Sequence, residues 1–114
     1  MRRAVNVRLL VASAAMFAAV SVFAGTNPSD ARQRQLVHLV RQDCGACHGM
    51  TLRGGLGPAL TADALRDKPV ESLRLTILNG RPGTPMPPWR EFVTESEADW
   101  IVEQLQKGFP HETH

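Results

Sequence analysis

Residues 44 to 48 read Cys44-Gly45-Ala46-Cys47-His48 and contain the only two cysteines of the chain. Two thiols about one helical turn apart can each form a thioether with a vinyl group of one porphyrin, and the next residue then reaches the iron. The spacing therefore predicts one covalent c-type haem, attached through Cys44 and Cys47, with His48 as an axial ligand of the iron. A redox dithiol or one half of a zinc site uses the same Cys-x-x-Cys spacing, and both alternatives stay open here.

A proline-rich segment, residues 81–89, supplies a candidate for the second iron ligand. Its four prolines exclude a helix interior or a central strand, so Met86 lies on a stiffened loop. A thioether sulfur opposite histidine is a known axial ligand of haem iron and raises its reduction potential. Met50 follows His48 by two residues and cannot easily reach the opposite face of the same ring. We predict that Met86 is the sixth ligand; the alternative is that it only lines the haem crevice.

Hydrophobic periodicity predicts an all-α chain that can position these groups. Helices are expected over about residues 30–43, 61–66, 69–78 and 94–107. Ser29 or Asp30 can cap the first helix, and Thr94-Glu95-Ser96-Glu97 is a capping-box pattern at the start of the last. The glycine-rich segment between the first two helices, residues 49–58, can approach a flat ring where side chains would collide.

The first 24 residues have the features of a secretory signal peptide. Arg2 and Arg3 precede an apolar run over residues 9–23, and small residues follow at Ala24-Gly25. This run is shorter than the ~20 residues that a spanning helix needs. We therefore expect a cleaved leader over residues 1–24, a single mature domain over residues 25–114, a periplasmic location and no stable membrane insertion. An uncleaved anchor is the alternative.

The charge balance changes when the leader is set aside. The leader carries three of the 13 Lys and Arg residues and no acid, so residues 25–114 keep ten basic and 11 acidic side chains. Nucleic-acid binding is not expected, because it requires clustered excess of Lys and Arg. A mature chain of this size has a modest core, to which a buried haem would add apolar mass. We expect a monomer.

Over nearly all of its mature length the sequence resembles the class I (monohaem) cytochromes c. The matching features are the N-terminal helix, the haem-binding pentapeptide, the Gly57-Pro58-Ala59-Leu60 segment, the methionine loop and the C-terminal helix. The resemblance implies a small fold in which the first and last helices cross around one covalently bound haem. It also implies that the backbone carbonyl of Pro58 accepts a hydrogen bond from His48 and orients it.

Three stretches look like the small NirC-type cytochromes encoded beside the haem-dependent dissimilatory nitrite reductase. They are residues 54–58, Asp67-Lys68-Pro69 and the loop over residues 80–89. This likeness implies a periplasmic carrier of single electrons in denitrification, without enzymatic activity, whose redox protein partners include nitrite reductase. Two alternatives stay open: a maturation factor for the specialised haem of that reductase, and a five-coordinate haem protein that binds a small ligand.

Overall fold

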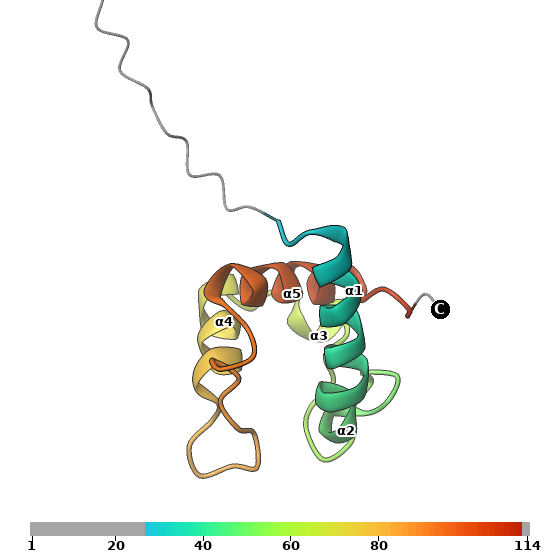
Figure 1. The fold of residues 1–114 in the computed structure, drawn as a ribbon. Coiled ribbons are helices and arrows are strands. Elements are labelled where there is room, and N and C mark those ends of the chain that lie inside the picture. The colour runs from blue at the N-terminus through green and yellow to red at the C-terminus, as the bar shows by residue number, and fades with distance from the viewer. Residues whose placement is uncertain (1–26, 113–114) are drawn as a thin grey trace, which may run out of the picture.

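The computed structural model describes residues 27–112, which form helices and loops without a strand. The helices in order are α1 (Asp30–Leu39), the π-helix η1 (Val40–Cys44), α2 (Gly45–His48), α3 (Ala62–Leu65), α4 (Val70–Asn79) and α5 (Glu95–Lys107). In Figure 1, α5 runs along one side of the molecule, with α1, η1 and α2 descending from one end and α4 from the other. The prediction of an all-α fold is confirmed.

The helix ends follow the capping signals of the sequence. The Ser29 hydroxyl accepts a hydrogen bond from the Arg32 amide at the start of α1. At the start of α5, the Thr94 hydroxyl accepts from the Glu97 amide, and the Glu97 carboxylate accepts from the Thr94 amide. This reciprocal pair is the predicted capping box. Pro69 precedes α4, where its missing N–H costs no helical hydrogen bond.

The first helix departs from its predicted regular form just before the cysteines. From Val40 to Cys44 the turns widen into a π-helix, and α-helical geometry resumes from Gly45 to His48. Hydrophobic spacing alone did not reveal this change, because a π-turn is one residue wider than an α-turn and its position depends on packing. Cys44 is the last residue of this π-helix, and Cys47 and His48 lie in the α-helical turn that follows it.

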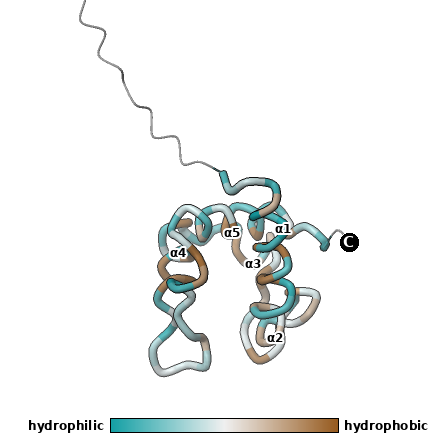
Figure 2. The backbone as a smooth tube through the Cα atoms, viewed as in Figure 1, coloured by the Kyte–Doolittle hydropathy of each residue, from teal (hydrophilic) through white to brown (hydrophobic). Residues whose placement is uncertain are grey.

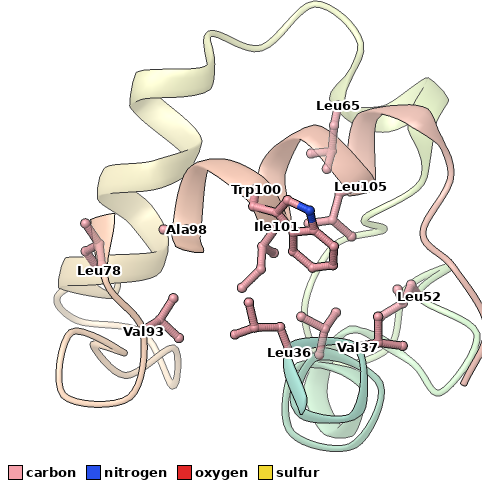
Figure 3. Packing of buried hydrophobic residues seen from close by; sticks show 11 residues of the cluster. Leu36, Val37, Leu52, Leu65, Leu78, Val93, Ala98, Trp100, Ile101 and Leu105 are labelled. Atoms are coloured by element: carbon pink, nitrogen blue, oxygen red, sulfur yellow. The ribbon is translucent and has the colours of Figure 1, made fainter. Parts of the chain in front are cut away.

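The protein core lies where α1 meets α5. Leu36 and Val37 of α1 pack in one cluster with Trp100, Ile101 and Leu105 of α5 (Figure 3). Trp100 is therefore a packing residue. Burying a side chain such as Leu36, which is fully covered, contributes about 1.5–3 kcal/mol. The cluster holds the two helices across each other, in the arrangement that the class I resemblance implied.

Apolar segments gather toward the middle of the molecule, on α4 and around α1 and α3, whereas the loop after α4 is pale (Figure 2). None of the helices within residues 27–112 has the length and apolarity required to cross a bilayer. The leader expected over residues 1–24 lies outside the described residues.

One arginine connects the beginnings of α1 and α5. Arg32 donates from Nε to Oε1 of Glu97 at 2.7 Å and from Nη2 to Oε2 at 3.0 Å. Its Nη2 also donates to the Phe92 carbonyl at 2.8 Å. The hydrogen bonds from Arg32 are the main reason that the pKa of Glu97 lies below its usual range. A single guanidinium therefore joins α1 to α5 and to the segment that precedes it.

We expect Arg32→Ala to lower the free energy of unfolding by about 1–3 kcal/mol at neutral pH, since hydrogen bonds between charged groups are lost. Because the pKa of Glu97 is lowered by folding, its stabilisation is complete above the unfolded-state value of about 4.3. It is lost as the pH falls through the lower folded-state pKa. Denaturant titrations at neutral and acidic pH measure both effects. Arg34→Ala, on an exposed residue of the same helix, is the control; equal stability of the two variants would contradict the prediction.

Candidate functional site

A crevice of about 890 Å³ separates the two arms that descend from α5. Its size is within the range of roughly 300–1,000 Å³ that is usual for cofactor and small-molecule sites. One wall comes from η1, α2 and the glycine-rich loop, and the other from α4 and the loop that follows it. The walls are largely apolar and include Leu39, Val40, Leu60, Leu73, Ile77 and Trp89. All five predicted site residues line this one crevice: Cys44, Cys47, His48, Pro58 and Met86.

The two cysteines lie on the crevice side of η1 and α2 and are not joined by a disulfide. Burial, with a smaller effect of the Asp43 carboxylate, raises the pKa of the Cys44 thiol to about 11. Reactive dithiols have the opposite property, a lowered pKa that provides the thiolate. The environment of Cys44 therefore disfavours the redox-dithiol alternative. As for zinc, residues 27–112 contain no group of three or more His, Cys, Asp or Glu side chains placed to share a metal ion.

The His48 ring is held by the glycine-rich loop. Its Nδ1 lies 2.7 Å from the Pro58 carbonyl oxygen. With the ring proton on Nδ1, that nitrogen donates to the carbonyl and leaves Nε2 as a free lone pair. The loop is fixed against α2 by backbone hydrogen bonds from Gly54 to the His48 carbonyl and from Gly57 to the Cys47 carbonyl. The histidine thus has a defined tautomer and orientation before any ligand is considered.

Gly57 is required by this close approach. A Cβ at this position would lie 2.8 Å from both Cε1 and Nδ1 of His48. This distance is shorter than van der Waals contact, so a Cβ would clash with the ring. The ring could move away only by lengthening its hydrogen bond to the Pro58 carbonyl. The glycine therefore permits the hydrogen bond that orients His48.

Met86 lies on the facing wall, in a loop stiffened by hydrogen bonds as well as prolines. The Arg81 amide donates to the Met86 carbonyl at 3.2 Å, and the Thr84 hydroxyl donates to the Arg81 carbonyl at 2.6 Å. The Trp89 amide donates to the Ile77 carbonyl at 3.0 Å, which attaches the end of the loop to α4. Met50, by contrast, is 59% exposed and lines a different hollow. Met86 is therefore the methionine that faces the crevice.

These residues fit an iron porphyrin. A neutral imidazole nitrogen and a thioether sulfur, both good ligands for haem iron, lie on the two walls of one apolar crevice. Two cysteines flank the same crevice at the spacing of a haem attachment signature. Within residues 27–112, the side chains of Cys44, Cys47 and Met86 form no hydrogen bond or ion pair that would compete with this role, and the His48 ring forms only the orienting bond to Pro58.

Comparison with known proteins agrees with this chemistry. Residues 31–104 match the family model described as cytochrome c oxidase, cbb3-type, subunit III. Cytochrome c55X of Pseudomonas aeruginosa is 53% identical over 108 residues, which cover 94% of this chain and 91% of the relative. Cytochrome c55X of Paracoccus denitrificans is 55% identical over 80 residues, covering 70% and 78%. The chain belongs to the cytochrome c55X family of c-type cytochromes. Its cofactor is accordingly covalently bound haem c.

Solved structures place the cytochrome in the same group. The c-type cytochrome NirC superposes with a TM-score of 0.70 at 58% identity, covering 71% of this chain and 95% of that one. The predicted likeness to NirC-type cytochromes and the predicted fold are thus confirmed. A dihydro-heme d1 dehydrogenase, NirN in complex with DHE, matches with a TM-score of 0.57 at 36% identity. That match covers 68% of this cytochrome but 16% of the dehydrogenase.

We expect Gly57→Ala to displace the His48 ring from the Pro58 carbonyl and to lower the free energy of unfolding by about 1–3 kcal/mol, as overpacking does. NMR of the reduced cytochrome would report the changed environment of the His48 ring. Gly83→Ala is the control: its φ of +80° favours glycine, but nothing lies within 4 Å of the added Cβ. It should cost about 1 kcal/mol and leave His48 unchanged. A Gly57→Ala protein with native His48 signals would refute the close-packing argument.

Proposed function

We propose that this cytochrome is a periplasmic carrier of single electrons whose haem iron is bound by His48 and Met86. The observation that carries the proposal is the placement of His48, oriented by Pro58, and Met86 on the two walls of one apolar crevice. Haem supplies one-electron chemistry by cycling its iron between the ferric and ferrous states. The chain supplies the ligands, the apolar surroundings and the rigid frame.

Each site residue has a separate task in this proposal. Cys44 and Cys47 hold the cofactor by thioether bonds, so it cannot dissociate. The Pro58 carbonyl fixes the proton on Nδ1 of His48 and increases the basicity of the ring. Met86 occupies the second axial position and raises the reduction potential. With both positions taken by the chain, no site is left for a substrate at the iron, which supports a carrier rather than an enzyme.

The proposed cellular setting is supported by the leader-like pattern of the first 24 residues and by the relatives. We assign residues 1–24 to a cleaved signal peptide and residues 25–114 to the exported cytochrome domain, which acts as a monomer. NirC-type cytochromes are associated with haem nitrite reductase, and we therefore assign denitrification as the pathway and nitrite reductase as a redox partner. Electron-transfer partners of this kind meet over small, transient interfaces.

A second function has one specific observation in its favour. The part of the dihydro-heme d1 dehydrogenase that matches this chain is 41% identical over 75 residues, yet makes up 15% of that protein. A cytochrome unit of this type therefore occurs within a protein that is named as a dehydrogenase of dihydro-haem d1. The alternative proposal is that this chain assists the maturation of the specialised haem of nitrite reductase, using its own haem for a single redox step.

Met86→Ala tests the axial ligation. We expect the covalent haem to be retained, the weak far-red absorption band of iron–methionine bonding to vanish, and the reduction potential to fall. The fall should be a sizeable part of the roughly 0.8 V over which axial ligands tune haem proteins. Met50→Ala is a matched control, because Met50 lies outside the crevice, and its spectrum and potential should equal those of the wild type. An unchanged spectrum in Met86→Ala would remove Met86 from the site.

The choice between the two functions depends on the partner. We expect the reduced cytochrome to be oxidised by purified nitrite reductase within the turnover time of that enzyme, at a rate that falls with ionic strength. Stopped-flow absorption of the haem measures this rate. In parallel, a deletion strain is assayed for the specialised haem content of its nitrite reductase. Rapid oxidation with intact cofactor in the deletion strain supports the carrier; slow oxidation with cofactor loss overturns it in favour of maturation.

A further inference from the structure

The loop that carries Met86, residues 80–89, closes on itself at its base. Gly80 directly follows α4, is buried and has a φ of +66°. A Cβ at this position would lie 2.7 Å from the Met86 carbonyl oxygen and the Pro87 carbonyl carbon, and 2.8 Å from the Pro88 nitrogen. All three are backbone atoms, which cannot turn aside as the end of a flexible side chain can. The segments that enter and leave the loop therefore touch through their main chains, where they come together below α4 in Figure 1.

Two backbone hydrogen bonds hold this contact closed. The Arg81 amide donates to the Met86 carbonyl at 3.2 Å, directly beside Gly80. The Trp89 amide donates to the Ile77 carbonyl at 3.0 Å, in the last turn of α4. These two bonds and the Gly80 contact form the neck of the Met86 loop.

Met86 is joined to the neck through its backbone, independently of its side chain. Its carbonyl takes part in both the Gly80 contact and the bond from Arg81. Its amide donates weakly, at 3.4 Å, to the Thr84 hydroxyl, which itself donates to the Arg81 carbonyl at 2.6 Å. One proline precedes Met86 and another follows it, and each fixes its own φ. The position from which the thioether faces the crevice is thus determined by contacts within the loop.

We propose that the neck keeps Met86 on the iron, with Gly80 and Thr84 as its positioning residues. The inference rests on the proposed function, which places haem iron between His48 and Met86. A thioether is neutral, so it binds iron without the help of an opposite charge. Its occupancy of the axial position therefore depends on how firmly the chain holds it there, as for any ligand that gains affinity from preorganisation.

An open neck would change what the iron can bind. A Cβ at Gly80 displaces the backbone of Met86, and the sulfur moves with it. The iron–sulfur bond then breaks more readily, and the nitrogen of a neutral base such as imidazole can form a bond to iron in its place, without a change in oxidation state. Because an axial methionine raises the reduction potential, its loss also lowers that potential.

The test compares variants of the mature holoprotein within this loop. Gly80→Ala adds the Cβ for which the neck has no room. Gly83→Ala is its matched control: at a φ of +80° alanine is similarly strained, but the added Cβ would have no neighbour within 4 Å among the described residues. Thr84→Val removes the hydroxyl at nearly constant shape, and Thr84→Ser keeps it. For each variant, far-red absorption reports iron–methionine bonding, imidazole titration of the ferric protein gives a Kd, voltammetry gives the reduction potential, and circular dichroism reports the helix content.

We expect Gly80→Ala to bind imidazole roughly tenfold or more tightly than the wild type, in line with the usual cost of overpacking. Its far-red band should weaken and its potential should fall, while its helix content stays native. Thr84→Val should change the same quantities in the same direction, whereas Thr84→Ser and Gly83→Ala should match the wild type. Native imidazole affinity in Gly80→Ala or in Thr84→Val, or equal effects of Gly80→Ala and Gly83→Ala, overturns the inference.

If Gly80→Ala does not fold, the two Thr84 variants decide: tighter imidazole binding by Thr84→Val that Thr84→Ser reverses supports the inference, and native affinity of Thr84→Val overturns it. A purely structural neck would lower the free energy of unfolding and leave the imidazole affinity of the folded protein unchanged. Absence of the far-red band in the wild type would refute ligation by Met86 itself, so failure of the proposed function is distinguishable from failure of this inference.

Discussion

The hydrogen bond between Nδ1 of His48 and the Pro58 carbonyl, 2.7 Å long, is the contact on which the local structure around the cysteines depends. It exists because the glycine-rich loop folds back onto α2, and it tolerates no side chain at Gly57. The same loop is attached to the Cys47 and His48 carbonyls by its own amides. A proline acceptor suits this position, because proline lacks an N–H that would need a partner beside the apolar crevice.

Both walls of the crevice are rigid, but different interactions stiffen them. On the histidine side the stiffness comes from backbone hydrogen bonds across a loop rich in glycine. On the methionine side it comes from prolines and from the Arg81 and Thr84 contacts that close the loop. Rigid positions for His48 and Met86 suit the proposed electron carrier, since axial groups that moved little between oxidation states would hold the potential and geometry steady. Both walls are connected through α5, whose buried residues pack in one cluster with Leu36 and Val37 of α1 and with Leu78 of α4.

Much of this architecture could be predicted from the sequence because its signals are local. Cys44, Cys47 and His48 are adjacent in the chain, the Thr94 capping box spans four residues, and α5 shows clear apolar periodicity. The missed features depend on tertiary contacts. Neither the π-turn before Cys44 nor the bond between Arg32 and Glu97, which are 65 positions apart, leaves a local pattern. Leu52 is another case. It is 2% exposed and has a φ of +59°, a backbone conformation that is uncommon for leucine. The sequence predicted only that the glycine-rich loop could approach a flat ring, not that Leu52 would be buried in it.

The apolar interior of this cytochrome is divided between chain and cofactor. Leu36 and Ala98 are fully covered by protein, whereas Leu39, Leu73 and Ile77 pack against that core while also lining the crevice. The second group is only partly buried, and a haem in the crevice, as proposed, would complete its burial. Small domains gain a limited hydrophobic stabilisation from their own residues. A porphyrin adds apolar surface to the core, and because it is held covalently it does not dissociate from the protein on dilution. In this proposal the ligand residues and the packing residues of the crevice serve one requirement, because the chain would reach its full core only around the group that performs its chemistry.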